Sequence, residues 1–228
     1  LAALTEKVFV TSRLFAGYSG ALDAGVLARL IAALPQGAPG ATAAHKRYDA
    51  AACAVEIPAD VGFCALGHNL YALGSSYSGA CPVLSSLVSY GYLWNMVRVQ
   101  GGAYGTGMNV RRSGDIFCYS YRDPNLDNTR AVFSAVADFI EDFAAQGMPL
   151  DDIIIGAVNT TDPLLDPAGV CESQCVRALK GVTPEELAKT RHELLATKPA
   201  DLAAMAGVLR KYAREGKFCT FSGTNGGA

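Results

Sequence analysis

Two side chains that can donate hydrogen bonds, Arg98 and Tyr104, flank a diglycine in the stretch VRVQGGAYG at residues 97–105. The guanidinium is always charged and carries several N–H donors, and the phenol carries one O–H donor. Fixed donors of this kind stabilise a carbonyl oxygen that gains negative charge during acyl transfer, and each is worth roughly 3 kcal/mol. The purely structural alternative is that Arg98 complements a helix dipole and that Tyr104 packs on the core. The residues by themselves leave both alternatives open.

The element that must position Arg98 is an amphipathic helix, predicted over residues 78–97. Arg98 continues its apolar stripe, so we expect the side chain to project from the buried face, where that face meets the edge of a sheet. Gly101 and Gly102 loosen the backbone before Tyr104, which lies in a strand predicted over 103–110. The predicted apolar face of the helix consists of Val83, Leu84, Leu87, Val88, Gly91, Trp94 and Val97.

The remaining periodicities predict an α+β fold, with a mostly antiparallel sheet and helices packed on one face. We expect one domain over residues 1–228. Predicted strands are 7–13, an antiparallel pair at 51–57 and 61–71, a hairpin of 103–110 with 115–121 that turns at Ser113-Gly114, and a closing strand at 217–221. Predicted helices are 21–34, one that follows residues 122–128 and runs to Phe143, and several beyond Leu150, of which one starts at Thr183-Pro184 and the last opens at Pro199. Residues 35–44 are predicted to form a loop.

Composition excludes several classes of function. Half of the 228 residues are hydrophobic, 18% are charged and the net charge is −2, so neither nucleic acid nor another polyanion is an expected partner. No apolar run reaches eighteen residues, so we expect no membrane partner. The apolar surplus is expected to face another domain or chain, which makes a homodimer of the isolated chain a candidate state. Seven dispersed cysteines predict free thiols and a cytoplasmic, reducing compartment, although a targeting segment upstream would not be visible.

The usual catalytic motifs are incomplete. GGAYGTG leaves a helix and enters a strand, which is the wrong order for a phosphate-binding loop. His192-Glu193 begins a helical zinc motif, but Ala196 stands where the second histidine is needed, and neither His45 nor His68 begins the inverted motif. Cys171 and Cys175 could share a helix face or bind a metal, but lack a second ligand pair at suitable spacing. We therefore expect no metal ligand or cofactor site in this chain.

The string YLWNMVRVQGGAYGTG, followed by FCYSYRDPNL, resembles the C-terminal domain of the presequence-protease branch of the pitrilysin/insulinase family of inverzincin peptidases. The resemblance extends over essentially the whole chain and implies that it forms the last quarter of such a protein. In that family, four α+β domains close around a chamber, and an H-x-x-E-H motif in the first domain binds zinc. The last domain contributes an arginine and a tyrosine near the scissile bond.

By motif position, the resemblance implies that Arg98 and Tyr104 contact the substrate in the transition state. Gly101, Gly102 and Ala103, in the turn between them, are predicted to be substrate-binding residues. It also implies that the N-terminal catalytic half of the parent and peptide substrates are the partners, and that zinc belongs to the parent. The parent is then a zinc metalloendopeptidase that degrades unstructured peptides, whereas this chain alone is expected to be inactive. The alternative is a non-catalytic scaffold or assembly domain of the same superfamily. A nucleotide-binding enzyme is the third candidate.

Overall fold

The computed structural model describes residues 2–37 and 51–223. These residues form two compact units. One unit contains the described residues of Leu1–Tyr48 together with Leu164–Pro184, and the other contains those of Asp49–Pro163 together with Glu185–Ala228. Arg98 and Tyr104 both belong to the second unit, which also contains the sheet. A single domain over residues 1–228 stays a prediction.

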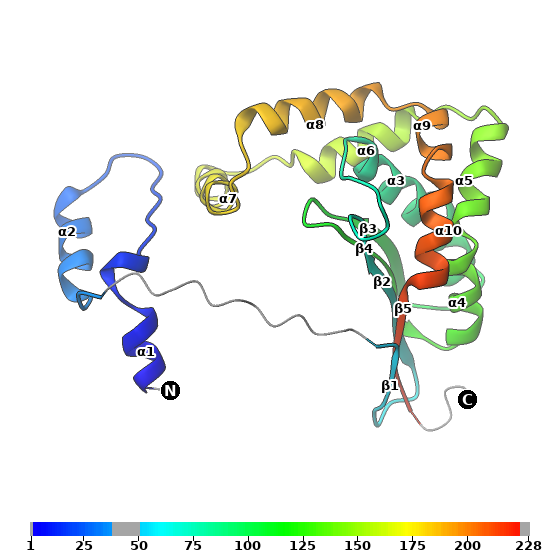
Figure 1. Ribbon diagram of the computed structural model, residues 1–228, viewed down its shortest axis with the longest axis horizontal. Coiled ribbons are helices and arrows are strands. Elements are labelled where there is room, and N and C mark those ends of the chain that lie inside the picture. The colour runs from blue at the N-terminus through cyan, green and yellow to red at the C-terminus, as the bar shows by residue number, and fades with distance from the viewer. Residues whose placement is uncertain (1, 38–50, 224–228) are drawn as a thin grey trace. The chain divides into compact units, whose positions relative to one another are not determined.

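A five-stranded sheet forms the centre of the second unit, in the order β1-β5-β2-β4-β3 (Figure 1). All neighbouring strands are antiparallel except β1 and β5, which are parallel, so the predicted mostly antiparallel sheet is confirmed. The strands are β1 Cys53–Glu56, β2 Gly62–Asn69, β3 Gly105–Val110, β4 Asp115–Asp123 and β5 Lys217–Ser222. The predicted hairpin and the predicted closing strand are both present.

The predicted pairing of the first two strands is wrong. The closing strand β5 lies between β1 and β2, and Phe221 is in register with Val55 on one side and Phe63 on the other. Inserting β5 in this way satisfies its backbone groups along both edges. A short connection makes two strands neighbours in the chain, but it cannot prevent a strand from a distant segment from pairing between them.

Helices cover one face of this sheet, as predicted, and α4, α5 and α10 lie along it in Figure 1. The long predicted helix that ends near Phe143 is interrupted at Ala135, and the last predicted helix is divided after Ala203. The helices of this unit are α3 Ala80–Ser86, η2 Leu87–Val99, α4 Leu126–Ser134, α5 Val136–Ala145, α6 Asp151–Thr161, α8 Pro184–Ala196, α9 Pro199–Ala203 and α10 Ala206–Glu215.

Tyr212 of α10 anchors the helical layer to the sheet. Its ring is completely buried, and its hydroxyl donates to the carbonyl oxygen of Leu66 at 2.6 Å while accepting from the N–H of Cys118 at 2.8 Å. Leu66 and Cys118 face each other on β2 and β4, so one phenol satisfies a backbone group on each strand. A buried phenol without such partners would be destabilising, so this arrangement allows Tyr212 to fill the core.

Among its described residues, the first unit contains helices and no strand; the helices are α1 Ala2–Val8, η1 Thr11–Arg13, α2 Ala24–Ala33 and α7 Pro167–Leu179. The strand predicted over 7–13 is therefore wrong. Good helix formers upstream, in AALTEKV, continue the helix through Val8, because a short β-branched run forms a strand only when another strand pairs with it. The helix predicted over 21–34 is confirmed, and Asp23 caps it by accepting from two backbone N–H groups. Residues 38–44 of the predicted loop lie outside the described residues.

Candidate functional site

Arg98 lies near the end of η2, which has the i to i+5 hydrogen bonds of a π-helix. The prediction that Arg98 projects from the buried face is wrong. The buried residues of η2 are Leu87, Val88, Leu93 and Val97, whereas Trp94 is 40% exposed and Arg98 is partly exposed. The wider turn of the π-helix moves Trp94 and Arg98 off the apolar stripe that α-helical spacing predicts. Both side chains therefore reach solvent on the same flank of the helix.

The Arg98 guanidinium lies over aromatic rings. Its central carbon is 3.9 Å from the centroid of the Trp94 ring and 6.0 Å from the centroid of the Tyr104 ring. Among the residues that the structure describes, no carboxylate forms an ion pair with Arg98. The cation is thus held by the faces of rings, and its in-plane N–H groups are available to a ligand.

The two glycines build a specific turn between η2 and β3. Gly102 has φ +82°, a conformation that other residues rarely adopt, and a Cβ at Gly101 would lie 2.6 Å from the carbonyl oxygen of Val97. The N–H of Gly102 donates to the backbone carbonyl oxygen of Arg98 at 3.0 Å, and the N–H of Ala103 donates to the carbonyl oxygen of Val97 at 3.1 Å. The turn is therefore closely hydrogen-bonded. Ala103 is only 3% exposed, so it packs beneath the turn.

Tyr104 leaves this turn with its backbone fixed and its ring free. Its N–H donates to the carbonyl oxygens of Tyr121 at 3.1 Å and Arg122 at 3.3 Å, just before β3 begins at Gly105. The side chain is 65% exposed and meets the Tyr121 ring edge-on at a centroid distance of 5.8 Å. The structure thus brings the Arg98 and Tyr104 side chains together in one exposed patch. Two donors in such a patch can bind one developing oxyanion.

Further aromatic rings extend the patch across the open face of the sheet. Tyr121 contacts Phe63 at a centroid distance of 5.3 Å, so Trp94, Arg98, Tyr104, Tyr121 and Phe63 form a continuous row, here called the aromatic row. Sequence reasoning missed the roles of Trp94, Tyr121 and Phe63. The spacing of Trp94, one turn before Arg98, was a local signal that could have indicated a stacked pair. The contacts of Tyr121 and Phe63 arise only from strand register.

The outer edge of β3 is closed by η2 and α3. The hydroxyl of Ser89 accepts from the N–H of Met108 at 2.8 Å and donates to the carbonyl oxygen of Met108 at 3.3 Å. The hydroxyl of Ser85 accepts from the N–H of Val110 at 3.0 Å. Such side-chain pairing satisfies backbone groups that an added strand would otherwise use. A peptide that reaches Arg98 and Tyr104 is therefore not expected to extend the sheet along Met108 and Val110.

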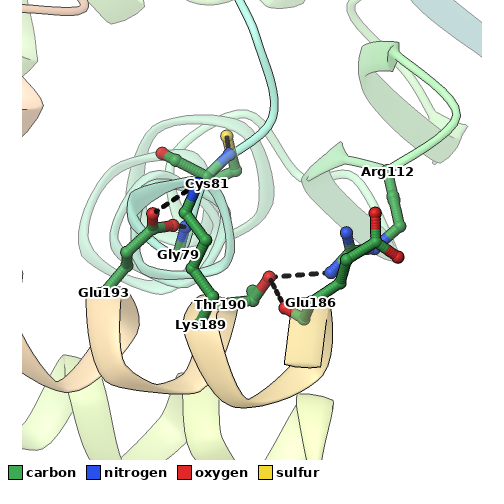
Figure 2. Close-up of polar contacts among 8 residues, drawn as sticks. Gly79, Cys81, Arg112, Glu186, Lys189, Thr190 and Glu193 are labelled. Atoms are coloured by element: carbon green, nitrogen blue, oxygen red, sulfur yellow. Dashed lines mark hydrogen bonds and ion pairs between the residues drawn. The ribbon is translucent and has the colours of Figure 1, made fainter. Parts of the chain in front are cut away.

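Glu193, the second residue of the incomplete zinc motif, holds α8 against the start of α3, as Figure 2 shows. Glu193 accepts a hydrogen bond from the N–H of Gly79 at 2.8 Å, and Thr190 accepts one from Arg112 at 2.7 Å. A Cβ at Gly79 would lie 2.3–2.4 Å from backbone atoms of α8, so only glycine permits this close approach. Glu193 therefore has a structural role in positioning the helix pair that leads to Arg98.

Within residues 2–37 and 51–223, no group of three His, Cys, Asp or Glu side chains is arranged to hold a metal ion. His45 lies outside the described residues.

Burial and the neighbouring Cys175 thiol raise the pKa of Cys171. The seven cysteines are all free, and Cys64, Cys81 and Cys118 are buried. These three buried thiols thus fill space in the core, as free thiols commonly do.

The part of the chain that contains this patch is similar to known proteins. A family model described as the PreP C-terminal domain matches residues 53–221, a range that contains the Arg98–Tyr104 turn and all five strands except Ser222, the last residue of β5. The chain belongs to this family. It is the C-terminal domain of a presequence-protease-like peptidase.

Two curated relatives support the assignment. The chain is 32% identical over 160 residues to "Protein HypA" of Clostridium perfringens, an alignment that covers 70% of this chain and 16% of that protein. It is 34% identical over 154 residues to "Presequence protease 1, chloroplastic/mitochondrial" of Arabidopsis thaliana, which covers 67% of this chain and 14% of the relative. The chain thus spans a small part of the length of these proteins.

A solved structure shares the fold. The structure described as the peptidase M16 inactive domain from Pseudomonas fluorescens superposes with a TM-score of 0.60 at 13% identity, over 90% of this chain and 51% of that one. At this identity the likeness concerns the fold alone. It agrees with the α+β layer found here, in which helices cover one face of a mostly antiparallel sheet.

Proposed function

We propose that this chain is the substrate-contacting C-terminal domain of a zinc metalloendopeptidase, and that it works together with an N-terminal half of the same parent protein that holds the zinc. The observation that carries the proposal is the pair of the partly exposed Arg98 and the exposed Tyr104, which share one patch and lack carboxylate partners among the described residues. Unstructured peptides are the proposed substrates. The chain by itself is proposed to be inactive, and the zinc is proposed to belong to the parent.

In the proposed mechanism, the guanidinium and the phenol hydroxyl donate to the carbonyl oxygen of the scissile peptide bond as that oxygen gains negative charge. Gly101, Gly102 and Ala103 give the backbone the shape that lets both side chains reach one oxygen, and the Ala103 side chain packs below them. Because the hydrogen-bonded turn sets the backbone positions of both residues before the substrate arrives, less reorganisation is needed during the reaction.

The test uses the full-length parent with Arg98→Ala or Tyr104→Phe. Each change removes one donor, so kcat for an unstructured peptide should fall by about 100-fold while the zinc content stays the same. Two matched controls remove the same groups elsewhere: Arg214→Ala on an exposed part of α10, and Tyr90→Phe on η2. Both controls should keep wild-type turnover. If both test variants cleave peptide at the wild-type rate, the assigned roles are wrong.

A second candidate function is a non-catalytic scaffold domain that assembles with partners. It is favoured by the large exposed apolar side chains, among them Val55, Tyr119 and Phe221 on the sheet, which another domain could cover. The two candidates differ upstream in the parent. An H-x-x-E-H motif followed by a glutamate ligand supports the peptidase, and its absence supports the scaffold. Homodimer formation by the isolated chain belongs to the second candidate and can be measured by sedimentation.

The compartment also remains a proposal. Among the described residues, no helix combines the length and the apolar character needed to cross a bilayer. The Arabidopsis thaliana relative is named as chloroplastic and mitochondrial, which differs from the cytoplasm predicted for this chain from its free cysteines. We propose a reducing compartment, to be tested by locating the tagged full-length parent in fractionated cells.

A further inference from the structure

Trp94 is the single tryptophan of the chain, and it lies directly under the cation of the candidate site. Its ring centroid is 3.9 Å from the central guanidinium carbon of Arg98, a stacking distance. A planar guanidinium stacked on an aromatic face is attracted by the ring and keeps its N–H groups pointing sideways. Trp94 therefore restricts the orientation of Arg98 without occupying its donors.

Arg210 on α10 is an arginine whose guanidinium is held by carboxylates instead of aromatic rings. Its guanidinium donates to Glu141 at 2.7 Å and to Asp138 at 3.1 Å, and the hydrogen bonds to these carboxylates raise its pKa. Donors held in this way are not available to a ligand. Arg98 instead contacts ring faces. Besides the Trp94 ring, the centroid of the Tyr104 ring lies 6.0 Å from its central guanidinium carbon. The two arginines thus differ in whether their N–H groups are already used.

We propose that Trp94 is a positioning residue: its indole ring fixes the Arg98 guanidinium so that the free N–H groups point to the substrate carbonyl. This inference rests on the proposed function of Arg98. Trp94 itself makes no proposed contact with the reacting atoms. Its partial exposure means that it can be changed without opening the core, whose nearest members on η2 are Leu93 and Val97.

The contact can be measured directly in the 228-residue chain, because Trp94 is its only source of tryptophan fluorescence. Arg98→Ala uncovers the ring face, so we expect emission at longer wavelength and stronger quenching by acrylamide. Arg98→Lys keeps the charge but loses the planar stack, and should give an intermediate result. Circular dichroism checks that each variant is folded. Unchanged emission and quenching in a folded Arg98→Ala chain would overturn the positioning contact, whatever the activity of the parent.

The consequence for catalysis is measured in the full-length parent. Trp94→Leu removes the ring but keeps an apolar side chain, and kcat should fall by roughly two- to fivefold, the size of an exposed cation–π contact, with KM less affected. Trp94→Phe retains an aromatic face and should restore most of the loss. In an Arg98→Ala background, Trp94→Leu should have no further effect, because the group that it positions is gone. Val99→Ala, which shortens an exposed apolar side chain on the same helix, is the control and should be neutral.

These outcomes separate the two proposals. If Arg98→Ala lowers kcat but Trp94→Leu does not, the positioning role is wrong and the proposed function stands. If Arg98→Ala leaves cleavage unchanged, the proposed function fails, even where fluorescence confirms the stacked pair. If Trp94→Leu lowers kcat to the same extent with and without Arg98, Trp94 acts by some other route and the inference is overturned.

Discussion

At the scale of single residues, Gly101 and Gly102 serve the candidate site for different reasons. Gly101 leaves no room for a side chain, because the carbonyl oxygen of Val97 lies where a Cβ would be. A Cβ at Gly102 would meet only the Pro124 side chain, at 3.3 Å, but the φ of +82° at Gly102 disfavours any L side chain. Together they set the path from Arg98 to Tyr104, so the geometry of the donors depends on both.

Gly102→Ala should lower the free energy of unfolding by about 1–2 kcal/mol, the cost of placing a Cβ in a left-handed conformation. Gly207→Ala is the matched control, since Gly207 lies in α10 and an added Cβ meets no atom within 4 Å. That control should raise stability by about 0.5–1 kcal/mol through helix propensity. Denaturant unfolding of the 228-residue chain measures both, and equal stability of Gly102→Ala and wild type would contradict the strain argument.

At the scale of elements, η2 and β3 are joined by more than their connecting turn. Ser89 on η2 and Ser85 on α3 satisfy backbone groups of Met108 and Val110 along the outer edge of β3. These hydroxyls keep the helix and the strand in register, so Arg98 at the end of η2 and Tyr104 before β3 are held at a fixed separation. The same hydrogen bonds protect the edge strand from pairing with another chain.

Ser89→Ala should destabilise the chain by about 1–3 kcal/mol, because the N–H of Met108 loses its partner in a partly buried place. Ser134→Ala is the control: its hydroxyl only bonds back to Arg130 on an exposed part of α4, so the change should stay within about 0.5 kcal/mol. Unfolding free energies of the two variants give the comparison. Similar small effects for both would show that the edge of β3 does not depend on the serine.

At the scale of the whole molecule, the core contains ionisable groups that the fold keeps neutral. Burial raises the pKa of Cys64 to about 11 and that of Cys118 to about 12, and burial also raises the pKa of Tyr212. Cys118 and Tyr212 are hydrogen-bonded across the helix–sheet interface, through the N–H of Cys118. The packed core therefore excludes the charged forms, and its stability is coupled to pH.

With respect to these thiols, the free energy of unfolding should be constant well below pH 9 and should fall as pH rises through 9 toward 11–12. The unfolded thiols ionise near their ordinary pKa of 9.0, whereas the folded ones ionise only at the raised pKa, so high pH favours the unfolded chain. Each thiol contributes up to about 1.4 kcal/mol per pH unit within this window. Urea unfolding between pH 8 and 11 measures the slope. Cys118→Ala should reduce it, and an unchanged slope would contradict the assignment.

Local chemistry made a large part of this fold predictable. The hairpin of β3 and β4 turns at Ser113-Gly114, α8 begins at Pro184, and the closing strand is present as β5. Each depends on turn residues, caps or a short β-branched and aromatic run, which act over a few neighbours. The strand predicted over 7–13 and the pairing of β1 with β2 were wrong, because strand formation and strand partners depend on segments far away in the chain.

The sequence by itself determined the pair of donors and the glycines between them, because residue type and spacing fix which groups are available and where the backbone can turn. Only the tertiary structure decided that Arg98 lies on the solvent side of η2, stacked on Trp94, and that Tyr121 and Phe63 continue the row. The physical reason is that π-helical hydrogen bonding and strand register are settled by packing across the whole unit. The local pattern around Arg98, read with α-helical spacing, placed the side chain on the wrong face.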